Sequence, residues 1–270
     1  MTAASGVALV TGAAGGVGRL AAQRLAAAGV TVVAVDSDAI GLERTARRAP
    51  QIRPDVLDVR DADAVEELVA RTEATLGPLE RLVHTAGAVS AAGLLSRPRD
   101  ELLGAMEIAY GGFVATIGAV VPRMVARDRG EVVVVTAAAG WWPTPHLGAA
   151  SAPAAAVAAA TEILALELAA TSVRVVCVCG PRVEAPMPDG SAGQGPLPGE
   201  LSPVPAEVVL DAAEQALDAG RVLALPGRWT TVRWRLRGLA PELVRRRAAT
   251  AGRVPRAARG RRRWPTSARW

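Results

Sequence analysis

The stretch VTGAAGGVGR, residues 10–19, decides the fold. It ends the apolar run at residues 6–11 and begins residues 18–29, where apolar residues recur at helical spacing. A glycine-rich turn between a buried strand and a helix lets the backbone approach a pyrophosphate, which the N–H groups of the helix N-terminus attract. The stretch therefore predicts a strand, a phosphate-binding turn and a helix, with the turn formed by Gly12, Gly16, Val17 and Gly18.

The same alternation of strand and helix continues along the chain. Further apolar strands are predicted at residues 30–36, 53–58, 81–87, 131–136, 173–179 and 221–226, and further helices at 63–76, 101–127, 153–170 and 205–219. Continuously apolar strands separated by helices are typical of a parallel sheet covered on both faces. We predict a doubly wound α/β domain, the Rossmann fold, over residues 1–227, with residues 228–270 as a basic C-terminal tail.

Residues 188–205, rich in Pro and Gly, interrupt the pattern without any periodicity. This segment is expected to be a mobile loop, either a lid over a ligand crevice or a surface insertion.

The composition narrows the setting of the protein. Cys177 and Cys179 are the only cysteines in 270 residues, which excludes a disulfide framework and a zinc site. The N-terminus lacks a signal-peptide pattern, and no window has the roughly 18 uncharged apolar residues of a membrane span. A cytoplasmic protein without a metal site is expected.

Charge is distributed unevenly. Residues 1–227 carry 17 Arg and 25 acidic residues, a net charge of −8, whereas residues 228–270 carry 14 Arg and one Glu, a net charge of +13. All 31 basic residues are Arg, and the chain has neither Lys nor Asn.

Asp36 ends the second predicted strand, 18 residues after Gly18. A carboxylate at that position accepts hydrogen bonds from ribose hydroxyls and repels a 2′-phosphate. NAD is therefore the expected cofactor, and NADP is less favoured.

These motifs resemble the short-chain dehydrogenase/reductase family over roughly residues 5–226. TGAAGGVG matches the family pattern Thr-Gly-x-x-x-Gly-x-Gly, and HTAG, residues 84–87, stands where the family has Asn-Asn-Ala-Gly. By this resemblance, Asp58 and Val59 contact the adenine, and Ala86 and Gly87 line the ribose side.

The resemblance also assigns positions to the family's four catalytic side chains, and each is alanine here. Ala109 stands in the Asn position, Ala137 in the Ser position, Ala150 in the Tyr position and Ala154 in the Lys position. No other alignment restores them, because Lys and Asn are absent and the only tyrosine, Tyr110, precedes the fifth strand. Pro153 is expected in the first turn of the helix, which would then begin near Ser151.

Few side chains are candidates to replace the missing chemistry. His146 could donate a proton, although an exposed loop histidine is the commoner case. Trp141 and Trp142 follow the fifth strand, where this family forms its substrate wall; they either stack on an apolar ligand or pack in the core. For Tyr110, packing in the core or at an interface is favoured.

The tail mixes Arg with Trp229, Val232, Trp234, Leu236 and Leu239. It is either an amphipathic segment that lies on an anionic membrane surface or a solvated tail. Nucleic-acid binding is not expected, because no recognition motif accompanies the charge.

Three functions remain open. The first is a divergent NAD-dependent oxidoreductase that acts on a hydrophobic carbonyl or alcohol without the Tyr/Lys proton relay. The second is a dinucleotide-binding protein without catalytic activity, a pseudoenzyme, and the third is a non-redox isomerase or cyclase on the same fold. The resemblance implies a homo-oligomer formed through the two long helices before and after the fifth strand.

Overall fold

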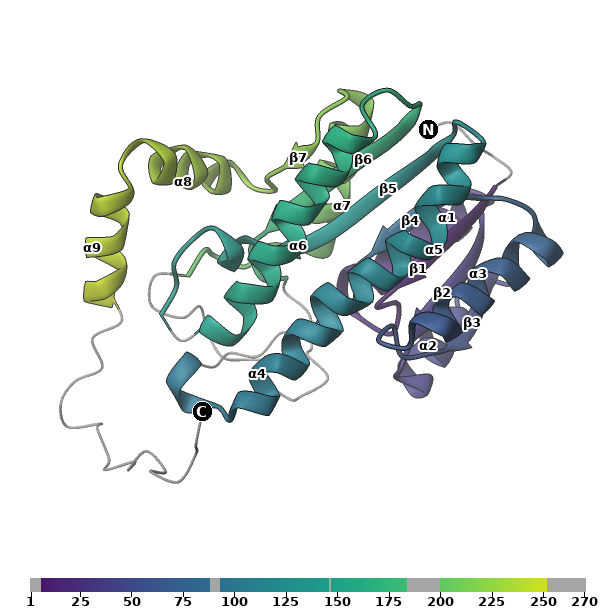
Figure 1. Ribbon diagram of the computed structural model, residues 1–270, viewed down its shortest axis with the longest axis horizontal. Coiled ribbons are helices and arrows are strands. Elements are labelled where there is room, and N and C mark those ends of the chain that lie inside the picture. The colour runs from purple at the N-terminus through teal and green to yellow at the C-terminus, as the bar shows by residue number, and fades with distance from the viewer. Residues whose placement is uncertain (1–5, 88–92, 146, 184–199, 252–270) are drawn as a thin grey trace.

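The computed structural model describes residues 6–87, 93–145, 147–183 and 200–251. Figure 1 shows one twisted sheet with helices on both faces, and its seven strands are paired in parallel in the order β3-β2-β1-β4-β5-β6-β7. The strands are β1 Val7–Thr11, β2 Thr31–Asp36, β3 Ile52–Val56, β4 Leu79–His84, β5 Gly130–Ala137, β6 Val173–Gly180 and β7 Leu223–Ala224. The helices are α1 Gly16–Ala27, α2 Ala39–Ala46, α3 Ala62–Leu76, α4 Arg99–Met106, α5 Gly112–Ala126, α6 Gly148–Glu167, α7 Ala206–Asp218, α8 Arg228–Leu239 and α9 Pro241–Ala251. This arrangement confirms the predicted doubly wound Rossmann fold.

The alternating faces of the strands build two apolar layers. One layer packs the sheet against α1 and α7, through alanines of α1 and residues such as Val209 and Leu217 of α7. The other packs it against α3, α5 and α6, with Phe113 fully buried at its centre. Because both faces are covered, central strands such as β1 are buried at every residue.

Strand order reverses between β1 and β4, so the connections from these two strands leave in opposite directions. A crevice forms at such a point, at the carboxyl ends of the strands. The fold therefore places the glycine-rich turn after β1 beside the end of β4.

The helices differ from the sequence-based prediction in three details. α2 was not predicted. α4 and α5 form one continuous helical stretch, Arg99–Ala126, joined by five residues of π-helix, Glu107–Gly111. α6 begins at Gly148, three residues before the predicted Ser151, so Pro153 lies within the helix rather than in its first turn. Proline has no N–H, so α6 lacks one backbone hydrogen bond close to its N-terminus.

Two helical stretches reach the length and mean hydropathy of a membrane-crossing segment, Arg99–Ala126 and Gly148–Glu167. Both contribute to the apolar layer that covers the sheet. A core helix passes the same hydropathy test, so these stretches are weak evidence for a membrane span.

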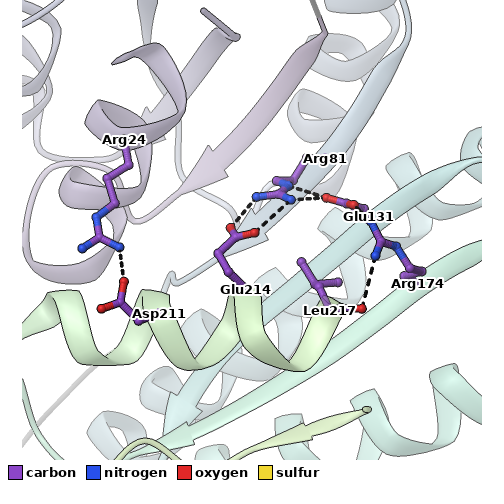
Figure 2. A network of polar contacts seen from close by, with 7 residues as sticks. All are labelled: Arg24, Arg81, Glu131, Arg174, Asp211, Glu214 and Leu217. Atoms are coloured by element: carbon purple, nitrogen blue, oxygen red, sulfur yellow. Dashed lines mark hydrogen bonds and ion pairs between the residues drawn. The ribbon is translucent and has the colours of Figure 1, made fainter. Parts of the chain in front are cut away.

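Charged side chains tie α7 to the sheet (Figure 2). The guanidinium of Arg81 on β4 bonds to Glu131 on β5, at 2.6 Å from Nε to Oε2, and to Glu214 on α7, at 2.6 Å from Nη1 to Oε1. Arg174 on β6 pairs with the same Glu131 and also donates to the Leu217 carbonyl at the end of α7. Arg24 of α1 pairs with Asp211, which lies on α7 one turn before Glu214.

The C-terminal region is more structured than the predicted tail up to Ala251. Residues 228–251 form α8 and α9, and Figure 1 shows them as a pair beyond the edge strand β7. Trp229, Val232 and Leu239 are exposed on α8, whereas Val244 of α9 is buried.

The predicted mobile loop at 188–205 lies mostly outside the described residues, but its end does not. Leu201 is buried, and Val204 forms a bridge with Val183 at the end of β6. The last residues of this segment are thus packed against the body of the protein.

Candidate active site

A cavity of about 480 Å³ opens at the carboxyl ends of β1, β2, β4, β5 and β6. Its lining combines the glycine-rich turn, the ends of these strands and the first turns of α6. Ligand pockets usually measure about 300–1,000 Å³, so the cavity is of the size that holds a cofactor and a small molecule.

The glycine-rich turn is shaped for close approach of a ligand. Gly12 and Gly16 have φ angles of +69° and +52°, which favour glycine. Gly18 does not line the cavity; it packs beneath the turn, where a Cβ atom would collide with the carbonyl oxygen of Gly12. A Cβ atom on Gly16, by contrast, would meet no atom within 4 Å and would occupy the open cavity. This turn leaves the space that a pyrophosphate needs above the N-terminus of α1.

Asp36 is fixed by two backbone N–H groups. Ala14 N–H donates to its Oδ2 at 2.9 Å, and Asp38 N–H donates to its Oδ1 at 3.1 Å. The carboxylate retains lone pairs for further donors, such as the two hydroxyls of a ribose. Asp38 also lines this end of the cavity and adds a second carboxylate beside Asp36.

Asp58 and Val59 line the cavity next to Asp36. Arg60 donates from Nε to both Asp58 carboxylate oxygens, and this hydrogen bonding lowers the pKa of the Asp58 carboxyl. Val59 is buried against α5, where a Cβ on Gly112 would lie 2.5 Å from Val59 Cγ2. Sequence reasoning did not single out Arg60, which places a cation beside the adenine position.

The other end of the cavity contains the four alanines. Ala109 from the π-helical segment, Ala137 from β5, and Ala150 and Ala154 from α6 all line it. The structure thus brings together the four positions that the resemblance assigned to catalytic side chains, and each carries only a methyl group there. Thr136, whose hydroxyl donates to the Ala154 carbonyl at 3.4 Å, is a neighbouring polar side chain that sequence reasoning missed.

The two tryptophans after β5 occupy different places. Trp142 lines the cavity, whereas Trp141 is not among the lining residues and packs edge-on against Trp142, with ring centroids 6.2 Å apart. The sequence left open whether these residues stack on a ligand or pack in the core, and of the two only Trp142 lines the cavity. Around Trp142 the cavity is lined mainly by apolar side chains, including Leu147, Pro153, Val157, Val183 and Leu201.

An ion pair lies at this apolar end. Arg182, directly after Gly180 and Pro181, donates from Nε to Oε1 of Glu200 at 3.2 Å. The Glu200 side chain is only 6% exposed, and both residues line the cavity. The pair joins the end of β6 to the end of the predicted loop, a contact between distant segments for which the sequence offers no local signal.

His84 forms part of the cavity wall at the end of β4. Its Nδ1 shares a 3.0 Å hydrogen bond with Thr11 Oγ1, and its Nε2 is buried with no hydrogen-bond partner among the described residues. Burial lowers the pKa of His84 to about 4, so the imidazole is neutral at pH 7.

The remaining candidates contribute less. His146 lies outside the described residues. Tyr110 does not line the cavity and stacks on Phe113, with ring centroids 6.4 Å apart. Cys177 and Cys179 are buried neighbours on β6, and their mutual hydrogen bond and burial raise the pKa of Cys179. Within the described ranges, no group of three His, Cys, Asp or Glu residues is arranged to hold a metal ion.

Comparison with known proteins finds a matching family model and relatives that cover most of the chain. A family model described as short chain dehydrogenase matches residues 6–193. The chain is 33% identical over 222 residues to 1-deoxy-11-beta-hydroxypentalenate dehydrogenase of Streptomyces avermitilis, covering 79% of this chain and 82% of that protein. It is 32% identical over 232 residues to 2-(R)-hydroxypropyl-CoM dehydrogenase of Xanthobacter autotrophicus, covering 82% of this chain and 91% of that protein.

A solved structure has the same fold. The short chain dehydrogenase/reductase from Burkholderia phymatum, in complex with NAD, superimposes with a TM-score of 0.78 over 88% of this chain and 95% of that one. Its sequence identity of 22% supports likeness of fold only.

Proposed function

Because this chain is a member of the short-chain dehydrogenase family, we propose that it binds NAD in preference to NADP and transfers hydride between that cofactor and an apolar carbonyl compound or alcohol without a Tyr/Lys proton relay. One observation carries the proposal. One cavity is lined by the glycine-rich turn, Asp36, Asp58 and Val59 at one end, and at the other by four alanines in the positions that the resemblance assigns to catalytic side chains.

The preference for NAD rests on the charge around the ribose. Asp36 is held in place by Ala14 and Asp38 N–H groups, and Asp38 adds a second carboxylate nearby. The nearest cation of the cavity wall, Arg60, is paired with Asp58. A 2′-phosphate would meet two acids there, and the arginine is already neutralised.

The apolar substrate follows from the lining of the far end. Trp142, Leu147 and Val157 present apolar surface to the cavity, and the Arg182–Glu200 pair is its charged feature. A bound nicotinamide supplies the hydride chemistry in this family. The protein's contribution is to exclude water and hold the two reactants in contact, an effect of positioning worth roughly 7–11 kcal/mol in favourable cases.

The absence of a Tyr/Lys proton relay favours substrates that carry their own proton donor. General acid–base catalysis contributes typically about 10²–10⁴-fold, and no Tyr or Lys is present at this site to supply it. A substrate with its own proton donor, such as a hydroxyl beside the ketone, compensates for part of that loss. We therefore expect faster turnover of an α-hydroxyketone than of the matching simple ketone.

A fluorescence titration with NADH and NADPH tests the cofactor site. Gly16→Asp places a carboxylate in the open space of the turn and should weaken NADH binding at least tenfold, whereas the uncharged Gly16→Asn tolerates the same positive φ and should bind more tightly than Gly16→Asp. Asp36→Ala should reduce the preference for NADH. Failure of the parent protein to bind either dinucleotide, or tighter binding of NADPH, would contradict the proposal.

Turnover separates this function from a second candidate, dinucleotide binding without catalysis, which the four alanines favour. NADH oxidation is followed with 2-hydroxycyclohexanone and with cyclohexanone as substrates. Consumption with the hydroxyketone supports the oxidoreductase. Tight NADH binding with no consumption in either reaction would support the second candidate instead.

A further inference from the structure

Helix α8 reaches the wall of the main cavity through Arg233. The Arg233 guanidinium lies over the ring of Trp142, with Cζ 5.2 Å from the ring centroid. Its Nη1 also donates to the backbone carbonyl of Glu200 at 3.3 Å. Trp142 and Glu200 both line the cavity, so one side chain from the C-terminal region touches two parts of its apolar end.

The chain before α8 fixes the direction of this helix. β7 pairs with β6, and Gly227 then turns the chain with a φ of +83°. The Thr230 N–H donates to the Gly227 carbonyl at 3.0 Å, and Thr230 is buried. The first turn of α8 is therefore fixed to Gly227, which follows β7, and Arg233 lies one turn later, where it is only partly exposed.

Trp142 borders a second cavity as well as the main one. This second cavity, of about 220 Å³, is lined by Trp142, Pro143, Arg233, Leu236, Leu243, Val244, Arg247 and Ala248. Its edge contact with Trp141 supports one side of the ring, and Arg233 supports it from α8.

We propose that α8 is part of the substrate site and that Arg233 is a positioning residue, which holds Trp142 as the apolar wall and fixes the end of the loop at Glu200. The wall then presents a flat ring to an apolar substrate. This inference rests on the proposed function, which assigns the apolar end of the cavity to the substrate. The proposed dinucleotide end is formed by other elements and does not depend on Arg233.

The first test observes Trp142 directly in the full-length protein. Tryptophan is replaced by 5-fluorotryptophan, and the Trp142 resonance among the six is assigned in ¹⁹F spectra by Trp142→Phe. Arg233→Gln should shift or broaden that resonance, because the cation over the ring is removed and the ring gains mobility. Arg235→Gln is the matched control: Arg235 is exposed, lies about 200° around the helix, and should leave the resonance unchanged.

The second test separates positioning from folding and from cofactor binding. Arg233→Gln should keep the NADH dissociation constant within twofold and raise the KM for 2-hydroxycyclohexanone about 3–10-fold with kcat little changed, as expected for loss of one cation–π contact. Arg233→Lys should restore part of the KM, and Arg235→Gln should match the parent.

The outcomes distinguish the two proposals. An unchanged Trp142 resonance in Arg233→Gln overturns the inference, whether or not the protein is active. An equal rise in the KM for 2-hydroxycyclohexanone in Arg233→Gln and Arg235→Gln also overturns it, because a general effect of removing a positive charge would then explain the result. If the parent protein does not bind NADH, the proposed function is contradicted. The ¹⁹F resonance of Trp142 in Arg233→Gln then still tests whether Arg233 positions Trp142.

Discussion

His84 connects the burial of one side chain to the pH dependence of stability. Its pKa is lowered to about 4 in the folded protein, whereas an imidazole in the unfolded chain titrates near pH 6.5. Between these two values the unfolded state binds the proton and the folded state does not. The free energy of unfolding therefore falls as the pH drops from 7 to 4, and this contribution is complete below pH 4.

We expect His84→Gln to lose less stability than the parent protein over that interval, by roughly 3 kcal/mol at most. Urea unfolding at pH 7, 5.5 and 4.5 measures the difference. His146→Gln serves as the control for the second histidine of the chain. Parallel pH profiles for the parent and His84→Gln would show that His84 titrates normally.

The four alanines permit a gain of function at the scale of single residues. Ala150 and Ala154 are buried in the protein but line the cavity, so larger side chains at these positions can extend into it. The double variant Ala150→Tyr/Ala154→Lys should raise NADH-dependent reduction of cyclohexanone, by up to about 10²–10⁴-fold if a proton relay is restored. Ala150→Phe/Ala154→Met, which fills the same space without the acid and the cation, should give no gain.

Sequence reasoning reached these residues unevenly. The glycine turn, Asp36 and the four alanine positions were accessible because each belongs to a short pattern at fixed spacing. Arg60 was not singled out, although its partner Asp58 lies only two residues away in the sequence. The Arg182–Glu200 pair and Arg233 were not accessible, because their partners meet only after the chain folds. Trp141 and Trp142 are identical residues at adjacent positions, and only the turn after β5 decides which one lines the cavity.

At the scale of elements, the Arg81 network determines how firmly α7 is held on the sheet. The Arg81 side chain is 19% exposed and pairs with both Glu131 and Glu214. In the pair between α1 and α7, the side chains of Arg24 and Asp211 are 39% and 55% exposed. Removing one partner of a mostly buried ion pair leaves the other charge buried without a partner, which is destabilising. An exposed ion pair contributes little, because water screens the attraction.

Arg81→Met should lower the free energy of unfolding by about 2–3 kcal/mol, and Arg24→Met by less than about 1 kcal/mol. Chemical denaturation of both variants at low and high ionic strength provides the measurement. Equal losses in the two variants would mean that burial does not strengthen the network.

Element boundaries were predicted well where periodicity was strong and poorly where the chain is alanine-rich. Strands β1, β2, β5 and β6 match their apolar runs closely. α6 was placed to begin at Ser151 from the rule for proline, but it begins at Gly148 and tolerates Pro153 close to its first turn. Helix propensity of the flanking alanines outweighs the one lost hydrogen bond.

At the scale of the whole molecule, α5 and α6 leave apolar side chains on the outer surface. Val114 is 46% exposed on α5, and Ile163 and Leu166 are 54% and 71% exposed on α6. We propose that a second copy of the chain covers this face. Ile163→Glu should shift the protein toward the monomer in sedimentation velocity, whereas Ile40→Glu on α2, where the side chain is 65% exposed, should not. A parent protein that is monomeric at micromolar concentration would contradict this.

The C-terminal helices give the molecule a basic end. Residues 228–251 carry seven Arg and one Glu, together with exposed Trp229, Val232 and Leu239. We propose that this surface contacts anionic lipid. Arg235→Gln/Arg237→Gln/Arg245→Gln/Arg246→Gln, which preserves Arg233, should reduce co-sedimentation with anionic vesicles at least tenfold, since each cation contributes roughly 1 kcal/mol. Neutral vesicles are the control, and unchanged sedimentation of the variant would refute the contact.

The ion pairs that join α7, α1 and the sheet all have arginine as their cation, because the chain contains no lysine. A guanidinium keeps its proton at every pH that a folded protein experiences, so base cannot discharge these pairs. Acid can, by protonating the carboxylates. These ion pairs therefore respond to pH in one direction only: they persist at alkaline pH and are lost when acid protonates their carboxylates.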